Sequence, residues 1–441
     1  MILLINPKTS KPTEIQTEYF REPNLGILYL AAILDEHNYP VDILDLEQYY
    51  DFNEKELEQL ILKNVRKYDI IGITSLTNTF YVAIKIVKLI KTAYPHKYII
   101  LGGPHVSFQY QEILNQYSFV DYICVGEAEN SLLELLNVLS KKETNQIEKR
   151  GIENQLGKIR GIAFKNSKNN IIFTGFPQPV DVESIPLPAR FLLPQENFHY
   201  RVANVIINRG CPNQCSFCSR QNLFKNIRIR SVKSIEAEIR DIISFQTYRY
   251  INFYDNININ RRFFEQFCEM FTENEFQIPW GCELRVDSVT SNDADLLKKA
   301  GCKLIATGIE SASLDVLRQN LKFQNPEKVK DGIAHIKDGG IPIQAYFVFG
   351  LPGETRLSVQ ETLEFIKSLP LTKEDTIDYF AATPYPGSHL WEEQEKYRIK
   401  IMETDFSKYD CRHLIFETID LDIKTLHELY PSTKEIETYF K

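Results

Sequence analysis

Three cysteines in the middle of the chain have a spacing that could support metal chemistry. Cys211, Cys215 and Cys218 form a C-x3-C-x2-C pattern directly after the apolar run Val205–Ile207. Three thiolates can hold three irons of a [4Fe-4S] cluster while the fourth iron stays open for another ligand. Zinc is the alternative, but it usually takes four ligands in two separated pairs. Because the chain has no second cysteine pair and no histidine close to this loop, the spacing favours the iron-sulfur cluster.

The chain as a whole has the composition of an ordinary folded protein. Its 441 residues are enough for two or three domains, and 43% of them are hydrophobic and 25% charged. The formal net charge of −8, without a long basic tract, argues against a protein whose main function is to bind the nucleic-acid backbone. The N-terminus lacks a signal-peptide pattern, and no apolar run is long enough to span a membrane. We therefore expect a cytoplasmic protein without a nucleic-acid partner or a membrane span, in a reducing compartment that suits such a cluster.

The first third of the sequence, residues 1–145, alternates short apolar runs with amphipathic stretches. This alternation predicts a parallel sheet with helices on both faces, which is an α/β, Rossmann-like domain. In such sheets, ligands bind beyond the carboxyl ends of the strands. The expected strands are Ile2–Ile5, Val41–Leu46, Ile70–Ser75, Tyr98–Leu101 and Tyr122–Val125.

The residues at these strand ends suit a bulky ligand. Glycines let a ligand approach the backbone closely, and hydroxyl groups can bond its polar edges. Any one of these turns alone is equally well explained as an ordinary strand-to-helix connection, because such turns favour glycine and serine. The candidates are Asn6, Pro7, Thr74, Ser75, Leu76, Thr77, Gly102, Gly103, Pro104, His105, Gly126 and Glu127.

Residues 146–198 interrupt the alternation. Two apolar runs on either side of the polar residues 165–170 predict a β-hairpin. Five prolines follow between residues 177 and 194. Because proline removes backbone donors and stiffens the chain, these prolines predict an extended linker. We expect the boundary between two domains near Pro186–Pro194.

Six further strands alternating with helices are expected in residues 199–390. They predict an open, partial (β/α)6 barrel of the TIM type, with its working face at the carboxyl ends of the strands. Charged groups gathered at these ends are costly to bury without a ligand, so the set favours a ligand site, although each loop alone fits a salt-bridged surface. The polar residues in question include Tyr254, Asp255, Asn256, Glu283, Arg285, Asp287, Glu310, Ser311, Gln344, Tyr346 and Glu354.

The cysteine motif, with the aromatic Phe217 before its last cysteine, resembles that of the radical S-adenosylmethionine (SAM) superfamily. The strand-end residues of the first domain resemble those of a cobalamin-binding domain. From Met1 to about Trp391 the chain is therefore similar to the cobalamin-binding, class B methyltransferases of this superfamily. The resemblance implies three cofactors: a [4Fe-4S] cluster, SAM and cobalamin. It leaves residues 391–441 as a C-terminal segment that caps the barrel.

The resemblance also implies roles for the barrel residues. The three cysteines and Tyr346 would be the catalytic residues, and Arg285 would bind the SAM carboxylate through its guanidinium fork. Glu310, with its neighbour Ser311, would contact the ribose hydroxyls or the amino group of SAM. The remaining contacts would be Tyr346 and the backbone at Phe217 near the adenine, and Asp255 and Asn256 near the amino end. Tyr254 is a further expected cofactor contact.

One departure from cobalamin-binding domains concerns the cobalt ligand. Many such domains carry an Asp-x-His-x-x-Gly loop after the first strand, whereas residues 7–18 contain no histidine. The partial match Asp35-Glu36-His37 lies at the end of the first expected helix and leads to Pro40. We therefore expect cobalamin to bind base-off, without a histidine ligand. A degenerate domain that binds no cofactor is the alternative.

The reaction implied by the resemblance is radical methylation. One electron from the cluster would cleave SAM, and the 5′-deoxyadenosyl radical would abstract hydrogen from an unactivated carbon. Methylcobalamin would give its methyl group to the substrate radical, and a second SAM would restore it. The alternatives are a non-methylating reaction (cyclisation, ring contraction or oxidative ring formation) and a non-catalytic, cobalamin- or redox-responsive binding protein. Expected partners are a small-molecule, lipid or peptide substrate and an electron donor such as flavodoxin or ferredoxin.

Overall fold

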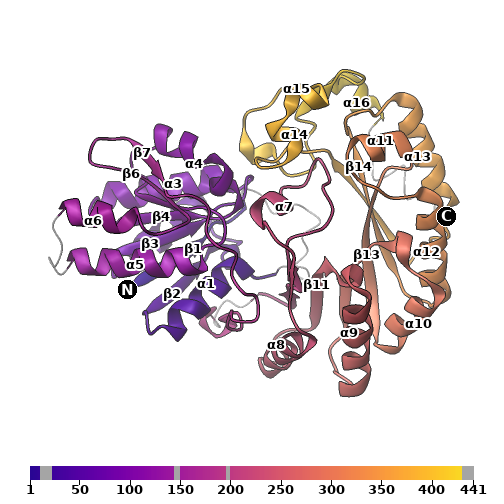
Figure 1. Ribbon diagram of the computed structural model, residues 1–441, viewed down its shortest axis with the longest axis horizontal. Helices are drawn as coiled ribbons and strands as arrows, with labels where there is room; N and C mark the ends of the chain where they lie inside the picture. Colours follow the sequence, from indigo (N-terminus) through magenta and orange to yellow (C-terminus); the bar gives the residue numbers. More distant parts are fainter. Residues whose placement is uncertain (10–21, 144–148, 195–198, 430–441) are drawn as a thin grey trace. The chain divides into compact units, whose positions relative to one another are not determined.

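The computed structural model describes residues 1–9, 22–143, 149–194 and 199–429, which are traced in Figure 1. The chain divides into two compact units. The first consists of Met1–His199 with Asn222–Asn226, and the second of Tyr200–Gln221 with Ile227–Lys441. Each is built around its own mainly parallel sheet, which confirms the expected α/β class. The expected domain limit at residue 145 lies outside the described residues, as do residues 430–441 of the expected C-terminal segment.

The first unit contains a seven-stranded sheet in the order β2-β1-β3-β4-β5-β6-β7. Strands β1 to β5 pair in parallel, and their residues are almost continuously buried because helices cover the sheet. These strands are β1 Ile2–Asn6, β2 Val41–Asp45, β3 Ile70–Thr74, β4 Tyr98–Gly102 and β5 Tyr122–Cys124. The helices are α1 Leu25–Glu36, α2 Glu54–Val65, α3 Phe80–Ala93, α4 Pro104–Gln116, α5 Glu129–Glu143 and α6 Lys149–Leu156.

Polar residues and prolines fix where several of these helices begin. Asn53 and Glu56 form a capping box at α2, in which each side chain accepts the other's backbone N–H, at 3.1 and 2.8 Å. The Asn24 side chain caps α1 by accepting from the Ile27 N–H. Pro104 stands in the first turn of α4, where its missing N–H costs nothing. Local sequence therefore sets these helix starts.

The expected hairpin is present, and it belongs to the first sheet. Strand β6, Ile162–Lys165, pairs antiparallel with β7, Ile171–Phe173, and also with β5. It covers an edge of the parallel sheet that would otherwise expose unpaired backbone groups. The proline-rich stretch that follows is bonded to the same unit, because the Ala189 N–H donates to the Leu28 carbonyl at 3.1 Å.

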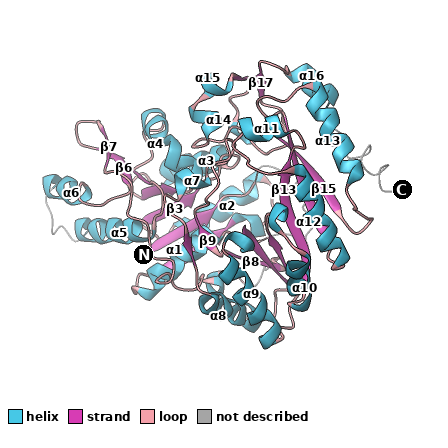
Figure 2. Cartoon of the chain, turned by 45° about the vertical axis from the view of Figure 1, so that its right-hand side comes forward, coloured by secondary structure: helices cyan, strands magenta, loops and turns pink. Residues whose placement is uncertain are grey.

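The second unit contains, among its described residues, a six-stranded parallel sheet in the order β15-β14-β13-β12-β11-β8. This is the expected open sheet, in which β8 and β15 are the two edges. Figure 2 shows several of its helices beside the strands. The strands are β8 Val202–Val205, β11 Tyr250–Asn256, β12 Trp280–Glu283, β13 Cys302–Glu310, β14 Ile343–Phe349 and β15 Thr376–Ala381. The helices are α8 Val232–Ser244, α9 Arg261–Asn274, α10 Ser291–Lys299, α11 Leu314–Gln319, α12 Pro326–Asp338 and α13 Arg356–Ser368.

Aromatic side chains form the core between α9 and the strands beneath it. Trp280 is 1% exposed and stacks on Phe271, with the ring centroids 4.5 Å apart. Phe253 and Phe267 meet edge to face at 5.0 Å in the same cluster. The indole N–H of Trp280 donates to the Ala300 carbonyl at 3.0 Å, so this large side chain leaves no buried donor unpaired.

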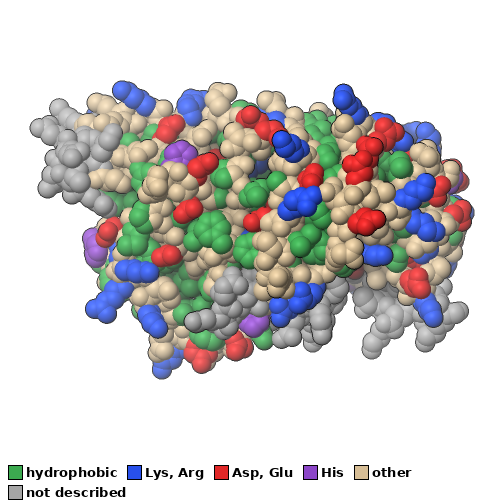
Figure 3. All heavy atoms as spheres, turned by 90° about the horizontal axis from the view of Figure 1, so that it is seen from below, with side chains coloured by type: hydrophobic (Ala, Val, Ile, Leu, Met, Phe, Trp, Pro, Cys, Tyr) green, Lys and Arg blue, Asp and Glu red, His purple; other side chains and the backbone are tan. Residues whose placement is uncertain are grey.

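The C-terminal segment forms a small cluster of its own within the second unit. It comprises β16 Ile399–Ile401, β17 Phe416–Thr418, α14 His389–Glu392, α15 Gln394–Tyr397 and α16 Ile423–Leu429. Its buried residues pack with Leu351 and Ala382, which follow β14 and β15. Among the described residues, no helix combines the length and apolar character needed to cross a lipid bilayer. On the face drawn in Figure 3, basic and acidic side chains are interspersed and neither sign dominates.

Candidate radical SAM site

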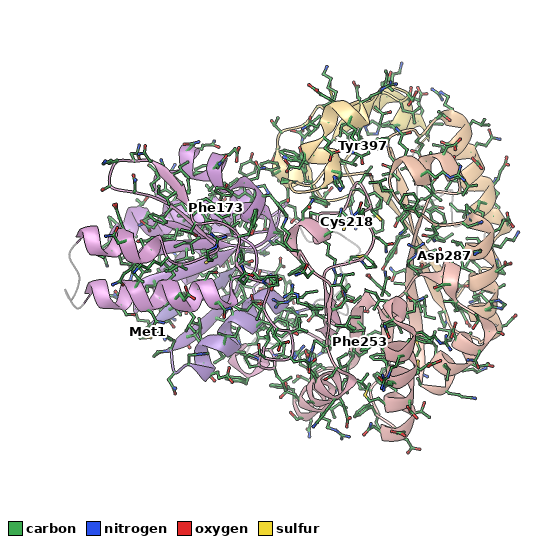
Figure 4. All side chains as sticks on the ribbon, in the orientation of Figure 1. Met1, Phe173, Cys218, Phe253, Asp287 and Tyr397 are labelled. Carbon is green, nitrogen blue, oxygen red and sulfur yellow. The ribbon has the colours of Figure 1, made fainter. Side chains whose placement is uncertain are left out.

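The three cysteines lie on the loop between β9, Asn208–Arg209, and α7, Arg220–Leu223; Figure 4 labels Cys218 on it. The loop turns tightly, because the Cys218 N–H donates to the Cys215 carbonyl at 3.1 Å and Gly210 has a φ of +84°. Cys215 is 9% exposed. Burial raises its pKa to about 11, and the nearby thiols of Cys218 and Cys211 add to this rise. The three thiols are therefore neighbours in the fold as well as in the sequence.

Ser216, between the first two loop thiols and the third, holds the loop in place. Its hydroxyl donates to Asn320 Oδ1 at 2.7 Å, and its N–H donates to the Asn320 carbonyl at 2.9 Å. Its carbonyl accepts from the Leu390 N–H at 3.0 Å. Both Ser216 and Asn320 are fully buried, so these bonds are shielded from competition with water.

Asp255, at the end of β11, anchors the start of the same loop. Its carboxylate accepts from the backbone N–H groups of Ile207 and Asn208, at 2.6 and 3.0 Å, and pairs with Arg220. Asp255 is 2% exposed, so these bonds are shielded from water. Its contacts hold the loop, and the expected position near the amino end of SAM stays a prediction.

Arg285 links the end of β12 to the cysteine loop. Its guanidinium pairs with both oxygens of Asp287, at 3.1 and 2.7 Å, and donates to Asn213 Oδ1 at 3.0 Å. The Asn213 amide in turn lies 3.6 Å from the Cys211 sulfur. Burial lowers the pKa of Arg285, but the Asp287 carboxylate outweighs this and the net direction is upward. The fork expected to bind a ligand carboxylate is therefore charged, and in this structure it holds Asp287.

Two further carboxyl groups lie at neighbouring strand ends. Glu310, at the end of β13, pairs with Lys322 at 2.9 Å. Burial raises the pKa of Glu283 at the end of β12 to about 8, with a smaller contribution from Asp255. The sequence had placed Glu310 at this edge, but it had not pointed to Lys322, which follows a short helix and no strand.

The other barrel residues differ in their surroundings. Ser311 is fully buried and its hydroxyl lies 3.2 Å from that of Thr362, so it supports the fold. The Tyr346 ring meets Phe380 edge to face at 5.5 Å, and Tyr254 is 41% exposed. The Phe217 side chain packs against the C-terminal cluster, and Asn256 pairs in register with Glu283.

The strand ends of the first unit form one bonded edge. The Ser75 N–H donates to the Gly102 carbonyl at 2.8 Å, and the Gly126 N–H donates to the Ser107 hydroxyl at 2.9 Å. Gly103 has a φ of +102°, and a Cβ on it would lie 2.7 Å from the Ser75 carbonyl oxygen. Leu76 leaves an apolar side chain 45% exposed beside this glycine-lined edge, which fits the flat, largely apolar ring of a corrin.

Four other residues expected at this edge support it from within. His105 is 1% exposed, and its ring centroid lies 4.4 Å from that of Phe80. Burial lowers the pKa of His105 to about 3, so the imidazole is neutral and sits under the edge. Glu127 accepts from the Val180 N–H at 3.2 Å, and Asn6 donates to Asp45 at 2.9 Å. Thr77 Oγ1 lies 3.3 Å from the His105 ring nitrogen.

The donor set fits a cluster held by three thiolates. The cations of Arg220, Arg285 and Lys322 all interact electrostatically with the cysteine sulfurs. They can therefore balance the negative charge of the thiolates that would hold a cluster. Within the described residues, no three His, Cys, Asp or Glu side chains converge on a point that could hold a single metal ion. A four-iron cluster instead takes one thiolate per iron, so its ligands stand apart.

Comparison with known proteins relates both units to described families. A B12-binding domain family matches residues 15–136, and the radical SAM superfamily matches residues 205–366. The chain is 30% identical, over 402 residues, to an uncharacterized methyltransferase of Pyrococcus horikoshii, covering 89% of this chain and 82% of that protein. The chain belongs to the cobalamin-dependent radical SAM family. Membership in this family implies a [4Fe-4S] cluster, SAM and cobalamin as cofactors.

Relatives of this chain are named for different reactions. The chain is 27% identical, over 396 residues, to an anaerobic magnesium-protoporphyrin IX monomethyl ester cyclase of Rubrivivax gelatinosus, covering 88% of this chain and 68% of the cyclase. It is 24% identical, over 424 residues, to a bacteriochlorophyllide d C-12(1)-methyltransferase of Chlorobaculum tepidum, covering 94% and 82%.

Solved structures of cobalamin-dependent radical SAM enzymes share this fold. The enzyme OxsB, solved with aqua-cobalamin and SAM, gives a TM-score of 0.76 at 18% identity, covering 100% of this chain and 67% of that one. The methyltransferase TsrM from Kitasatospora setae, solved with cobalamin and a [4Fe-4S] cluster, gives 0.73 at 15% identity, covering 96% and 83%.

Proposed function

We propose that this protein is a radical C-methyltransferase that acts on an unactivated carbon. The observation that carries the proposal is similarity to a methyltransferase across 89% of the chain, spanning both units. The Chlorobaculum methyltransferase supports the same reaction, because the match covers 94% of this chain. When bound, the cofactors supply an adenosyl radical for hydrogen abstraction and a methyl group for the carbon that loses the hydrogen.

The side chains of the barrel edge would bind and orient SAM. Cys211, Cys215 and Cys218 would hold the cluster, and Arg285 and Glu310 would bind the polar groups of SAM at the ends of β12 and β13. Both side chains are held by ion pairs, Arg285 with Asp287 and Glu310 with Lys322. These pairs orient the two charged groups at the strand ends, so SAM would bind by exchanging partners with them.

We further propose that the substrate is a small molecule, lipid or peptide, and that a flavodoxin or ferredoxin donates the electron. The reducing cytoplasm is the compartment in which such a cluster persists. A non-methylating ring-forming reaction is the second candidate, because the Rubrivivax cyclase is 27% identical over 88% of this chain.

Two products of SAM distinguish these functions. The full chain is reconstituted anaerobically with iron, sulfide and cobalamin, reduced with titanium citrate, and given SAM. Reductive cleavage of SAM releases 5′-deoxyadenosine. Methyl transfer from SAM to the reduced cobalamin releases S-adenosylhomocysteine, in an amount limited by the cobalamin when no substrate is present, so a methyltransferase yields both. 5′-Deoxyadenosine alone would favour the second candidate. Neither product, from protein that has bound its cluster, would point to a non-catalytic binding protein.

The matched variants are Cys218→Ala and Cys268→Ala. Cys218→Ala removes one expected ligand, so we expect loss of the cluster absorbance. We also expect at least a hundredfold loss of 5′-deoxyadenosine, because even the outer partners of metal ligands are worth about 10–100-fold. Cys268 is a buried cysteine of α9, and its replacement by alanine should leave the cluster intact. Full cleavage activity in Cys218→Ala would contradict the ligand assignment.

A further inference from the structure

Lys322 reaches the cysteine loop on the same segment that holds this loop in place. Helix α11 ends at Gln319, and the next residue, Asn320, makes the paired bonds to Ser216. The Asn320 amide also donates to the Pro352 carbonyl at 2.9 Å, which ties the segment to the loop after β14. Because Asn320 is fully bonded and buried, the position of the residues that follow it is fixed.

The backbone then turns Lys322 inward. Leu321 adopts a left-handed conformation with a φ of +54°, and the Lys322 N–H donates to the Leu317 carbonyl at 2.9 Å. The Lys322 side chain is 13% exposed, and its ammonium lies 2.9 Å from Glu310 Oε1. The left-handed conformation is unfavourable for leucine. At Leu321 it turns the chain so that the Lys322 ammonium reaches Glu310.

The strand beneath this ion pair leaves room for it. A Cβ on Gly308 of β13 would lie 2.3 Å from Glu310 Oε1 and 3.3 Å from the Lys322 nitrogen. Glu310 itself has a φ of +68°, so its carboxylate is held against the lysine by a strained backbone. The pair therefore occupies a defined position, with Cys215 close enough to interact electrostatically with the ammonium.

We propose that the positive charge of Lys322 raises the reduction potential of the cluster. Uptake of one electron from an external reductant adds negative charge to a centre already surrounded by three thiolates. A largely buried positive charge that interacts electrostatically with Cys215 stabilises that added charge, and net charge near a cluster is one of the determinants of its reduction potential. Glu310 opposes this effect and limits it. The inference rests on the cluster assignment alone and holds whether or not the enzyme transfers methyl groups.

The test is a potentiometric titration of the reconstituted cluster in the full chain, followed by electron paramagnetic resonance, without SAM or cobalamin. In Lys322→Met we expect the ratio of reduced to oxidised cluster at a fixed potential to fall about tenfold, which is a shift of about 59 mV for one electron. Lys322→Arg keeps the charge and should restore most of the wild-type value. Lys328→Met removes an exposed lysine of α12 and should leave the titration unchanged.

Glu310→Gln provides an independent arm, because it removes the opposing charge and should shift the titration the other way. Equal midpoints in wild type and Lys322→Met would overturn the inference. If Lys322→Met binds no cluster, Glu310→Gln decides: a higher potential supports the inference and an unchanged one overturns it. Failure of the wild type itself to bind iron and sulfide would instead overturn the cluster assignment, and the inference with it.

Discussion

Glu354 shows how a polar residue at the working edge of a barrel can serve the fold. The sequence placed it in the glycine-rich turn after the fifth strand, among groups that could face a ligand. In the structure it is fully buried, and its Oε2 accepts from the Gly350 N–H at 2.5 Å while Oε1 has no hydrogen-bond partner. Burial raises the pKa of this carboxyl to about 8, so the folded protein holds it in the neutral form near pH 7.

This burial makes stability depend on pH in a defined direction. Because the pKa of Glu354 is raised in the folded state, the folded protein binds this proton more tightly than the unfolded chain does. The stability that the neutral carboxyl contributes is fully present below about pH 4.5 and is lost as the pH rises through about 8. Glu354→Gln should therefore stabilise the second unit relative to wild type at pH 8.5 and have a smaller effect at pH 5, by chemical denaturation. Glu361→Gln, at an exposed position of α13, should match wild type at both values. A wild-type advantage that grows with pH would contradict the assignment.

At the scale of elements, the β4–α4 connection depends on a glycine that no other residue can replace. Gly103 has backbone angles of +102° and 174°, a region that is essentially confined to glycine. Its missing side chain also allows the Ser75 backbone of the neighbouring strand end to approach. The two strand ends are thereby held together at the edge where a cofactor would lie.

Gly103→Ala should lower the free energy of unfolding of the first unit by roughly 2–4 kcal/mol, because backbone strain and the contact with Ser75 add together. Gly102→Ala is the matched control, since its Cβ would meet only the Cys124 Cβ at an ordinary 4.0 Å. Urea denaturation monitored by far-ultraviolet circular dichroism measures both variants. Similar losses for the two would show that crowding at Gly103 has no special cost.

Much of the fold could be predicted from the sequence because its signals are local. The alternation of apolar strands and amphipathic helices marks both parallel sheets, and the cysteine spacing lies within eight consecutive residues, 211–218. The placement of β6 against β5 could not be predicted, because pairing between strands far apart in sequence leaves no local pattern. The hairpin was therefore expected in a linker.

The contacts that each residue makes in the candidate site were harder to predict than which residues lie there. Strand-end position correctly located Glu310 and Arg285 at one edge, but the sequence does not show that Asp255 faces backbone N–H groups or that Ser311 is buried. Lys322 reaches the edge from a turn after α11, so only the tertiary fold reveals it. Strand ends are visible in the sequence, whereas only the tertiary contacts distinguish side chains such as Arg285 from buried supporting groups such as Ser311.

At the scale of the whole molecule, the two ends of the strands in the second sheet have different roles. The cysteine loop lies at the carboxyl ends of the strands. At the amino ends, Asp375 stabilises the sheet, and its fully buried side chain lies just before β15. This carboxylate accepts from the Ile343 N–H and pairs with Lys337, both at 2.7 Å. Such a division, with chemistry at the carboxyl edge and stability at the amino edge, is general in parallel barrels.

Asp375→Ala should therefore lower stability without changing the chemistry. We expect a loss of about 2–4 kcal/mol from the second unit, because the partly exposed Lys337 and the buried backbone N–H of Ile343 would both lose their partner. Iron bound per chain and 5′-deoxyadenosine formed per cluster should be unchanged at temperatures where the variant is folded. Asp338→Ala, at an exposed neighbouring position, should change stability by less than about 0.5 kcal/mol. A stable Asp375→Ala protein with altered cleavage would contradict this separation.

The bonds of Ser216 have a consequence for the order of events during synthesis. Ser216 and Asn320 are 104 residues apart, and the third partner, Leu390, comes later still. A chain emerging from the ribosome therefore displays its three thiols well before the residues that fix their arrangement. The bonds that order the loop therefore form only after residues 320 and 390 have been synthesised, so during translation the three thiols are exposed on a loop that is not yet fixed.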